Sequence, residues 1–138
     1  MSIVQGQTTS FKVELYEGVH NFLTDTFKIA LYTANADLNQ STTVYSSSNE
    51  VSGTGYSLGG KTLTGTTVSS SGTTAYINFD NVVWDPASFT ARCALIYNLS
   101  KSNKSVAVLD FGSDKTTTTK FTITMPVNSS TTALLRSN

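Results

Sequence analysis

The sequence has few of the residues on which most protein chemistry depends. Its 138 residues include one cysteine, one histidine and two prolines, and only 13% of them are charged. The single cysteine, Cys93, excludes an intramolecular disulfide, and its place in the apolar run ARCALIY indicates a small buried side chain rather than a reactive thiol. No second histidine or cysteine lies near His20, so we expect a packing or helix-surface residue there rather than a metal ligand or catalytic base.

Charge and hydropathy also exclude several classes of partner. The formal net charge is zero, so the chain has no excess of positive charge with which to neutralise nucleic acid or an anionic membrane. No apolar run approaches the roughly 18 residues that a membrane-spanning helix requires. The first ten residues, MSIVQGQTTS, lack the basic and apolar regions of a signal peptide, so we expect synthesis in a cytoplasm.

What the sequence has in abundance is serine and threonine, about 30% of residues, together with apolar runs typical of strands. The clearest pattern is in residues 89–112, where apolar runs at 93–97 and 106–111 flank a polar linker at 98–105. Both runs are nearly continuous, which predicts a β-hairpin covered on both faces and central to a single core. We expect the side chains of Leu95, Tyr97, Val108 and Phe111 to be buried. We also expect that Ile96→Asp or Leu109→Asp would abolish folding.

The rest of the chain predicts one helix and several further strands. Residues 1–10 are polar without periodicity and are expected to form an extended or mobile arm. Apolar residues at helical spacing predict a helix over residues 11–22, with Thr9 or Ser10 as its N-cap. Alternating or apolar segments predict strands at 26–33, 121–125 and 133–136, a hairpin of 63–69 with 74–84 across 70–73, and a turn at 85–88.

Two polar segments connect these elements. Residues 34–61 are long for a connection and are expected to form a packed loop or to contain a short strand at 42–45. Residues 113–120 are expected to be a polar connection. The sum is a mainly β protein of about seven strands with one short N-terminal helix, forming a β-sandwich or flattened barrel. We expect a single β-rich domain over residues 11–138, preceded by the arm.

One segment matches a nucleotide-binding motif. Residues 55–62, GYSLGGKT, satisfy the phosphate-loop pattern, and VAVLD at 106–110 resembles the acidic strand that accompanies such loops. A phosphate loop, however, joins a buried strand to a helix whose N-terminus binds the phosphates. The residues before and after this segment favour neither element, so we interpret it as a Gly-rich turn.

Other candidate sites are equally weak. Asp80 with Asp85, or Asp110 with Asp114, could form an acid pair or calcium site, but their spacing does not match a calcium loop and capping of turns explains them. Tyr45 and Tyr56 could contact a protein or sugar, although aromatic residues in loops more often lie over the edge of a core. The sequence therefore nominates no catalytic, cofactor-binding or metal-binding residues and predicts a protein that is not an enzyme.

The order of the segments resembles a family of small proteins encoded among the virion genes of tailed bacteriophages. The most specific pieces are EVSGTGYSLGG at 50–60, FTARCALIYN at 89–98 and AVLDFGSDK at 107–115, and the resemblance covers residues 11–136. It implies a non-enzymatic structural role in the particle, most often as a capsid decoration (cement) protein on the outer head shell. No binding residues can be carried over from this family.

The resemblance also implies partners and a location. The partners would be the major capsid protein or other virion subunits, and the chain would be a homo-oligomer, a trimer being one arrangement. The protein would be made in the host bacterial cytoplasm and would reside on the surface of the virion head. A tail or host-attachment module that binds a receptor or glycan is the alternative. We expect residues 1–10 and the loop 34–61 to become ordered against a neighbouring subunit or the shell.

Overall fold

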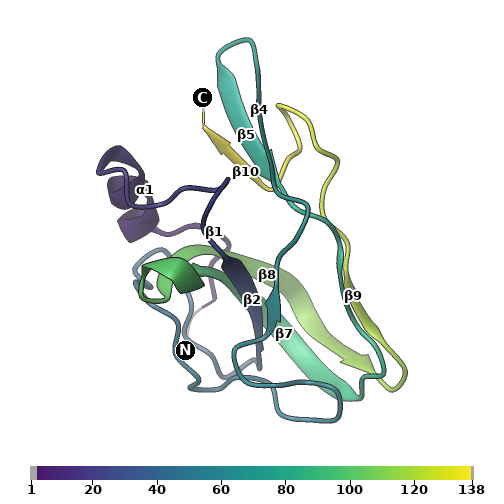
Figure 1. The fold of residues 1–138 in the computed structure, drawn as a ribbon. Coiled ribbons are helices and arrows are strands. Elements are labelled where there is room, and N and C mark those ends of the chain that lie inside the picture. Colours follow the sequence, from purple (N-terminus) through teal and green to yellow (C-terminus); the bar gives the residue numbers. More distant parts are fainter. Residues whose placement is uncertain (1–2, 138) are drawn as a thin grey trace.

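The computed structural model describes residues 3–137, which form three antiparallel sheets, one α-helix and one turn of 3-10 helix (Figure 1). No sheet closes into a barrel, and the arrangement confirms the predicted mainly β, sandwich-like fold with a short N-terminal helix. In chain order the elements are β1 (Gly6–Gln7), α1 (Thr9–Tyr16), β2 (Phe27–Tyr32), β3 (Lys61–Thr62), β4 (Thr67–Ser71), β5 (Thr74–Asn78), β6 (Val82–Trp84), β7 (Phe89–Asn98), η1 (Leu99–Lys101), β8 (Lys104–Thr117), β9 (Phe121–Ile123) and β10 (Leu135–Ser137).

The largest sheet has the strand order β1-β8-β7-β2-β3 and is built on the β7–β8 hairpin, as predicted. Residues 113–117, expected to be a polar connection, are instead part of β8. The register explains why the sequence misleads here. Ala91 pairs with Lys115 and Cys93 with Asp110, so the four residues 111–114 of β8 bulge out opposite Arg92 alone. Such a bulge interrupts the alternation that identifies a strand.

Both faces of this sheet are covered, as the continuous apolar runs predicted, but the expectation of a single core is wrong. On one face, Ile29, Leu31 and Ile96 pack with side chains from α1 and the two smaller sheets. On the other face, a separate cluster contains Tyr32, Leu95, Tyr97 and Val108 together with residues of the long loop between β2 and β3. The sheet itself separates the two clusters, because successive strand residues point to opposite faces.

Burial within the hairpin differs from the prediction at two positions. Leu95, Tyr97 and Val108 are at most 2% exposed, as expected. Phe111 and Leu109 are only half-buried, packed at the margin of the first cluster. Phe111 is the first residue of the bulge, and Leu109 lies two residues before it.

The two smaller sheets cover the first cluster, and they correct the predicted second hairpin. β4 and β5 do form a hairpin, which β10 extends, but β5 ends at Asn78. β6 belongs to a different sheet and pairs with β9. Polar Asp80 and Asn81 separate β5 from β6, and Asn81 accepts a hydrogen bond at 2.7 Å from the backbone N–H of Met125 just beyond β9. The chain therefore changes sheets within the segment 74–84, which the sequence predicted as one arm of a hairpin.

Helix α1 is shorter than the predicted 11–22 and begins earlier. Its N-cap is Thr8, whose hydroxyl accepts from the backbone N–H of Phe11. It ends because Gly18 adopts a positive φ of 73°, and the N–H groups of Gly18 and Val19 bond the carbonyls of Leu15 and Glu14. This is a Schellman ending, which glycine favours because it has no Cβ.

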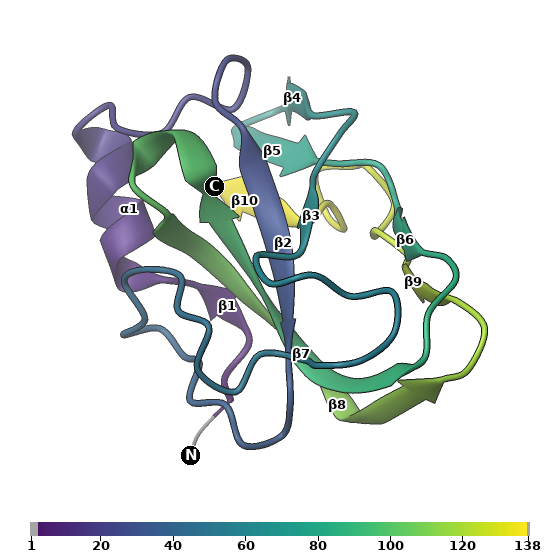
Figure 2. The same ribbon diagram turned by 60° about the horizontal axis from the view of Figure 1, so that its bottom comes forward.

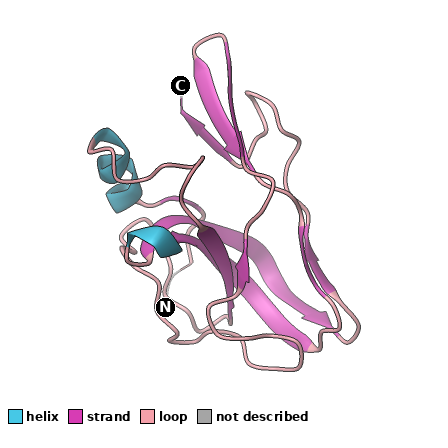
Figure 3. Ribbon diagram, in the orientation of Figure 1, coloured by secondary structure: helices cyan, strands magenta, loops and turns pink. Residues whose placement is uncertain are grey.

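Residues 3–10 differ from the expected extended or mobile arm. Gly6 and Gln7 form β1 against Val108 and Ala107, and Thr8 is fully buried, with its hydroxyl 2.9 Å from that of Ser105. Residues 1 and 2 lie outside the described residues. The loop at 33–60 contains no strand at 42–45, where Val44 alone forms a bridge, to Lys104. Leu38, Glu50 and Thr54 form the loop's other isolated bridges. It follows one face of the large sheet (Figures 2 and 3).

Candidate functional site

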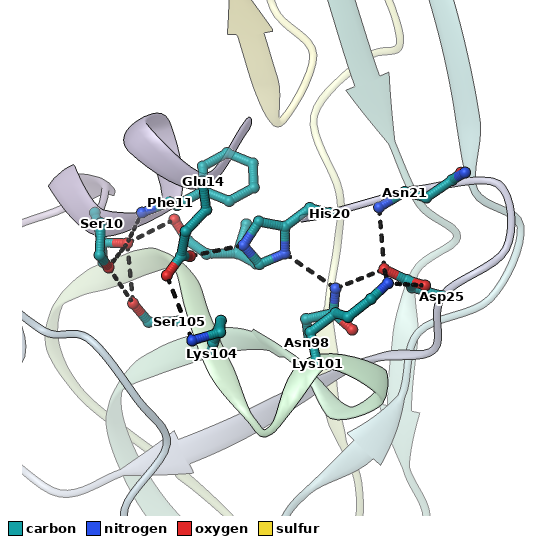
Figure 4. Close-up of polar contacts among 12 residues, drawn as sticks. Ser10, Phe11, Glu14, His20, Asn21, Asp25, Asn98, Lys101, Lys104 and Ser105 are labelled. Atoms are coloured by element: carbon teal, nitrogen blue, oxygen red, sulfur yellow. Dashed lines mark hydrogen bonds and ion pairs between the residues drawn. The ribbon is translucent and has the colours of Figure 1, made fainter. Parts of the chain in front are cut away.

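A connected polar cluster lies where α1 meets the end of β7, and His20 is at its centre (Figure 4). The His20 side chain is fully buried, with Nε2 2.8 Å from Oε1 of Glu14 and Nδ1 3.0 Å from Nδ2 of Asn98. Because an amide nitrogen only donates, Nδ1 accepts and Nε2 carries the proton. Both ring nitrogens are therefore occupied, and His20 links α1 to β7 instead of facing a substrate.

Asp25 forms the other end of this cluster. Its carboxylate accepts from Nδ2 of Asn98 at 2.9 Å and from the backbone N–H of Asn21 at 3.0 Å, and Lys101 Nζ lies 3.0 Å from Oδ1. Burial by itself raises the pKa of Asp25, but the hydrogen bonds from Asn98, Asn21 and Lys101 and the Lys101 charge outweigh it, so its pKa is lowered. No pattern in the sequence points to Asp25 or Asn98, because the side chains that contact them lie more than 70 residues away in the chain.

A second polar cluster surrounds the buried carboxylate of Glu50. It accepts hydrogen bonds from the hydroxyl of Tyr45 at 2.6 Å, from the hydroxyl of Tyr56, and from the backbone N–H of Gly59 at 2.8 Å. Tyr97 donates to the carbonyl of Gly59 at 2.6 Å and stacks on Tyr45 at 4.6 Å. These contacts fasten the loop at 33–60 to the sheet.

The tyrosines of this cluster are correspondingly hard to ionise. Burial raises the pKa of Tyr97 to about 12, with the Glu50 charge adding to the effect. Burial and the hydrogen bond to Glu50 raise the pKa values of Tyr45 and Tyr56 further. Tyr45 and Tyr56 were candidates for contact with a protein or sugar, but their hydroxyls are held within the loop.

The phosphate-loop match has a structural explanation in its glycines. Gly60 has a φ of 78°, and a Cβ there would lie 1.8 Å from the carbonyl oxygen of Ile29. Gly55 has a φ of 87°, and a Cβ there would lie 2.0 Å from the carbonyl oxygen of Pro86. Lys61 begins the short strand β3, and its Nζ donates to the carbonyl of Val83 at 2.7 Å. The glycines thus permit close backbone packing, and a strand rather than a helix follows them.

The candidate carboxylate pairs and the cysteine have ordinary surroundings. Asp110 lies 3.4 Å from Arg92 Nε and accepts from the backbone N–H of Gly112, whereas Asp114 is exposed. Asp80 and Asp85 are also exposed. Within residues 3–137, no group of three or more His, Cys, Asp or Glu side chains could hold a metal ion. Burial and the nearby Asp110 charge raise the pKa of the Cys93 thiol to about 12.

An open groove of about 950 Å³ lies between β1 and β8 on one side and β9 and β10 on the other. We call it the β8–β10 groove. Half-buried Leu109, Phe111 and Leu134 line it, next to the core. Its charged lining residues are Asp110, Lys115, Lys120 and Arg136. A concave, partly apolar surface of this kind is the type of place where a partner binds.

Helix α1 also presents exposed apolar side chains. Phe11 is the only buried residue of the helix, whereas Val13 is 52% and Tyr16 95% exposed. Val13, Tyr16 and Glu17 share one side of the helix by their spacing, and we call this the α1 face. Large exposed apolar side chains that cluster in this way typically mark interaction surfaces.

Comparison with models of protein families, with curated proteins and with solved structures found no match. Across residues 3–137, no helix is long and apolar enough to cross a membrane. Function must therefore be argued from the surfaces and the sequence resemblance.

Proposed function

We propose that this protein is a non-enzymatic structural component of a bacteriophage particle that decorates the outer shell of the head. The observation that carries the proposal is a contrast between the interior and the surface. The polar groups of His20, Asp25 and Glu50 are engaged in internal contacts, whereas Tyr16 and Val13 project from the surface. Such a molecule is suited to binding other proteins.

The sequence resemblance supports the same role, and so does the way the loops are held. The loop at 33–60 is fastened by Glu50, and α1 by its contacts with β7 and β8. The surfaces are thus presented on a pre-organised scaffold, which reduces the entropy that association costs. The sequence predicted that residues 1–10 and the loop 34–61 become ordered against a partner. Because residues 3–10 and 33–60 already have defined internal contacts, we propose instead that they bind a partner in this folded form.

The test is to mix the purified full-length chain with heads that lack a decoration protein and to image the particles by electron cryo-microscopy. Density at many symmetric positions over the shell is the expected result. Heads that already carry their decoration protein are the control and should gain none. Absence of binding to the shell, or density only at the tail or neck, would overturn the assignment to the head.

A host-attachment role has one observation in its favour. A shallow hollow of about 400 Å³ in the loop at 33–60 is lined by hydroxyl and amide side chains, among them Asn39, Ser41 and Thr43. Sugars are recognised by such groups, usually with an aromatic ring for stacking. Tyr32 lines the hollow but is only 1% exposed. Binding of the isolated chain to cell-surface glycans, with no binding to heads, would favour this alternative.

A further inference from the structure

We propose that copies of the chain bind each other through these two surfaces: the partly apolar β8–β10 groove of one copy receives the α1 face of a second copy. The contact would join neighbouring copies in the proposed assembly on the head, but it does not depend on that assembly.

The first argument is that α1 is poorly covered. It has eight residues, and an isolated helix of that length is not stable in water. Phe11 anchors one side, while the side with Val13 and Tyr16 faces solvent. A large aromatic side chain that is 95% exposed beside a second apolar residue is well placed to be an interface anchor.

The second argument is charge. Lys115, Lys120 and Arg136 line the groove, and none of them has an ion-pair partner within residues 3–137. Asp110 is the carboxylate in the lining, and Arg92 already pairs with it. The groove therefore presents an excess of positive charge around an apolar floor. Glu17 on the α1 face also lacks an ion-pair partner in the described part of the chain, so its carboxylate can pair with one of the three groove cations. Lys12, one turn before Tyr16, is likewise exposed and unpaired within residues 3–137 and lies at the edge of this face.

The third argument is geometric. The half-buried floor residues Leu109, Phe111 and Leu134 give the groove apolar contacts for a side chain such as Tyr16. The groove and the α1 face are different surfaces, so the contact is heterologous and each copy has one half of it free for the next. Contacts of this type produce rings when they close and chains when they do not.

The experiment is sedimentation velocity on the full-length chain at concentrations up to about 1 mM, the range in which a small contact is detectable. The wild-type chain should sediment faster as its concentration rises, and less so at high salt. Tyr16→Asp, and separately the double change Lys115→Glu with Lys120→Glu, should each weaken association at least about tenfold. Leu58→Asp, at a 68% exposed position outside both surfaces, is the matched control and should associate like the wild type.

Mixing the two defective variants makes the test specific. The Tyr16→Asp chain keeps an intact groove and the Lys115→Glu, Lys120→Glu chain keeps an intact α1 face, so a 1:1 mixture should form a dimer and stop there. A wild-type chain that stays monomeric, variants that associate normally, or a mixture that gains no dimer would each overturn the inference. The proposed binding to the head is measured separately with particles, so failure here does not decide it.

Discussion

Nδ2 of Asn98 lies 2.9 Å from Oδ2 of Asp25, and the same nitrogen also lies 3.0 Å from Nδ1 of His20. One amide therefore holds an ionised carboxylate and a neutral imidazole in place at the same time. Through Glu14 and Lys101, the contact joins α1, the segment before β2, β7 and η1. The stability of this polar cluster depends on the negative charge of Asp25.

The first prediction concerns acid stability. Asp25 has a pKa below the ordinary value of 3.8, so the unfolded chain binds more protons than the folded chain between the two values. The stability that Asp25 contributes is complete above pH 3.8 and is lost as the pH falls through the lower, folded-state pKa. Asp25→Asn should lower the free energy of unfolding at neutral pH, and the deficit should shrink on acidification. Urea titrations across this range measure it.

Asp85→Asn is the control for this experiment, because Asp85 is exposed. It should leave the difference between neutral and acidic stability as in the wild type. An Asp25→Asn deficit that is the same at every pH would show that the substitution disturbs packing and that the ionised carboxylate is unimportant.

The second prediction concerns the loop at 33–60. Glu50→Ala removes the acceptor for Tyr45, Tyr56 and the N–H of Gly59, which would leave buried donors unpaired. Each hydrogen bond to a charged group contributes about 1.5–3 kcal/mol, and losing the desolvation cost of the buried carboxylate offsets part of the three losses, so we expect a total of roughly 3 kcal/mol or more. Limited proteolysis should cut within the loop first. Tyr45→Phe removes one donor and should have a clearly smaller effect, and equal effects would contradict this account.

The parts of the fold that the sequence predicted are those determined by local patterns. The β7–β8 hairpin follows from two continuous apolar runs, and coverage of both faces follows from the same feature. The helix was found, but its end was placed wrongly because apolar spacing continued beyond Gly18, whose positive φ stops it.

The parts that were missed depend on distant residues. The sequence predicted β6 as part of the hairpin arm 74–84, but β6 pairs with β9, about 40 residues later in the chain. The second core cluster exists because the polar loop at 33–60 folds over the sheet, and no periodicity in that loop indicates it. The polar clusters at Asn98 and Glu50 were missed for the same reason, since a composition rich in polar residues does not show which of them are buried.

The third prediction tests why glycine stands at position 60. Gly60→Ala would place Cβ 1.8 Å from the carbonyl oxygen of Ile29, so strand β2 or the loop must move. We expect destabilisation of more than about 3 kcal/mol, measured by denaturant unfolding. Gly72→Ala is the matched control, because Gly72 also has a positive φ but no atom lies within 4 Å of its Cβ position. It should show only the conformational cost, about 1–2 kcal/mol.

The fourth prediction separates two positions of the central hairpin that the sequence treated alike. Ile96 is fully buried between sheets, whereas Leu109 is half-buried in the floor of the β8–β10 groove. Ile96→Asp should abolish folding, because a buried carboxylate without a partner costs several kcal/mol. Leu109→Asp should still fold, since its carboxylate can reach water, with a loss of about 2 kcal/mol. Circular dichroism melts distinguish the outcomes: a cooperative transition for Ile96→Asp would show that the centre of the sheet tolerates a charge, and none for Leu109→Asp would show that the groove floor is closed to water.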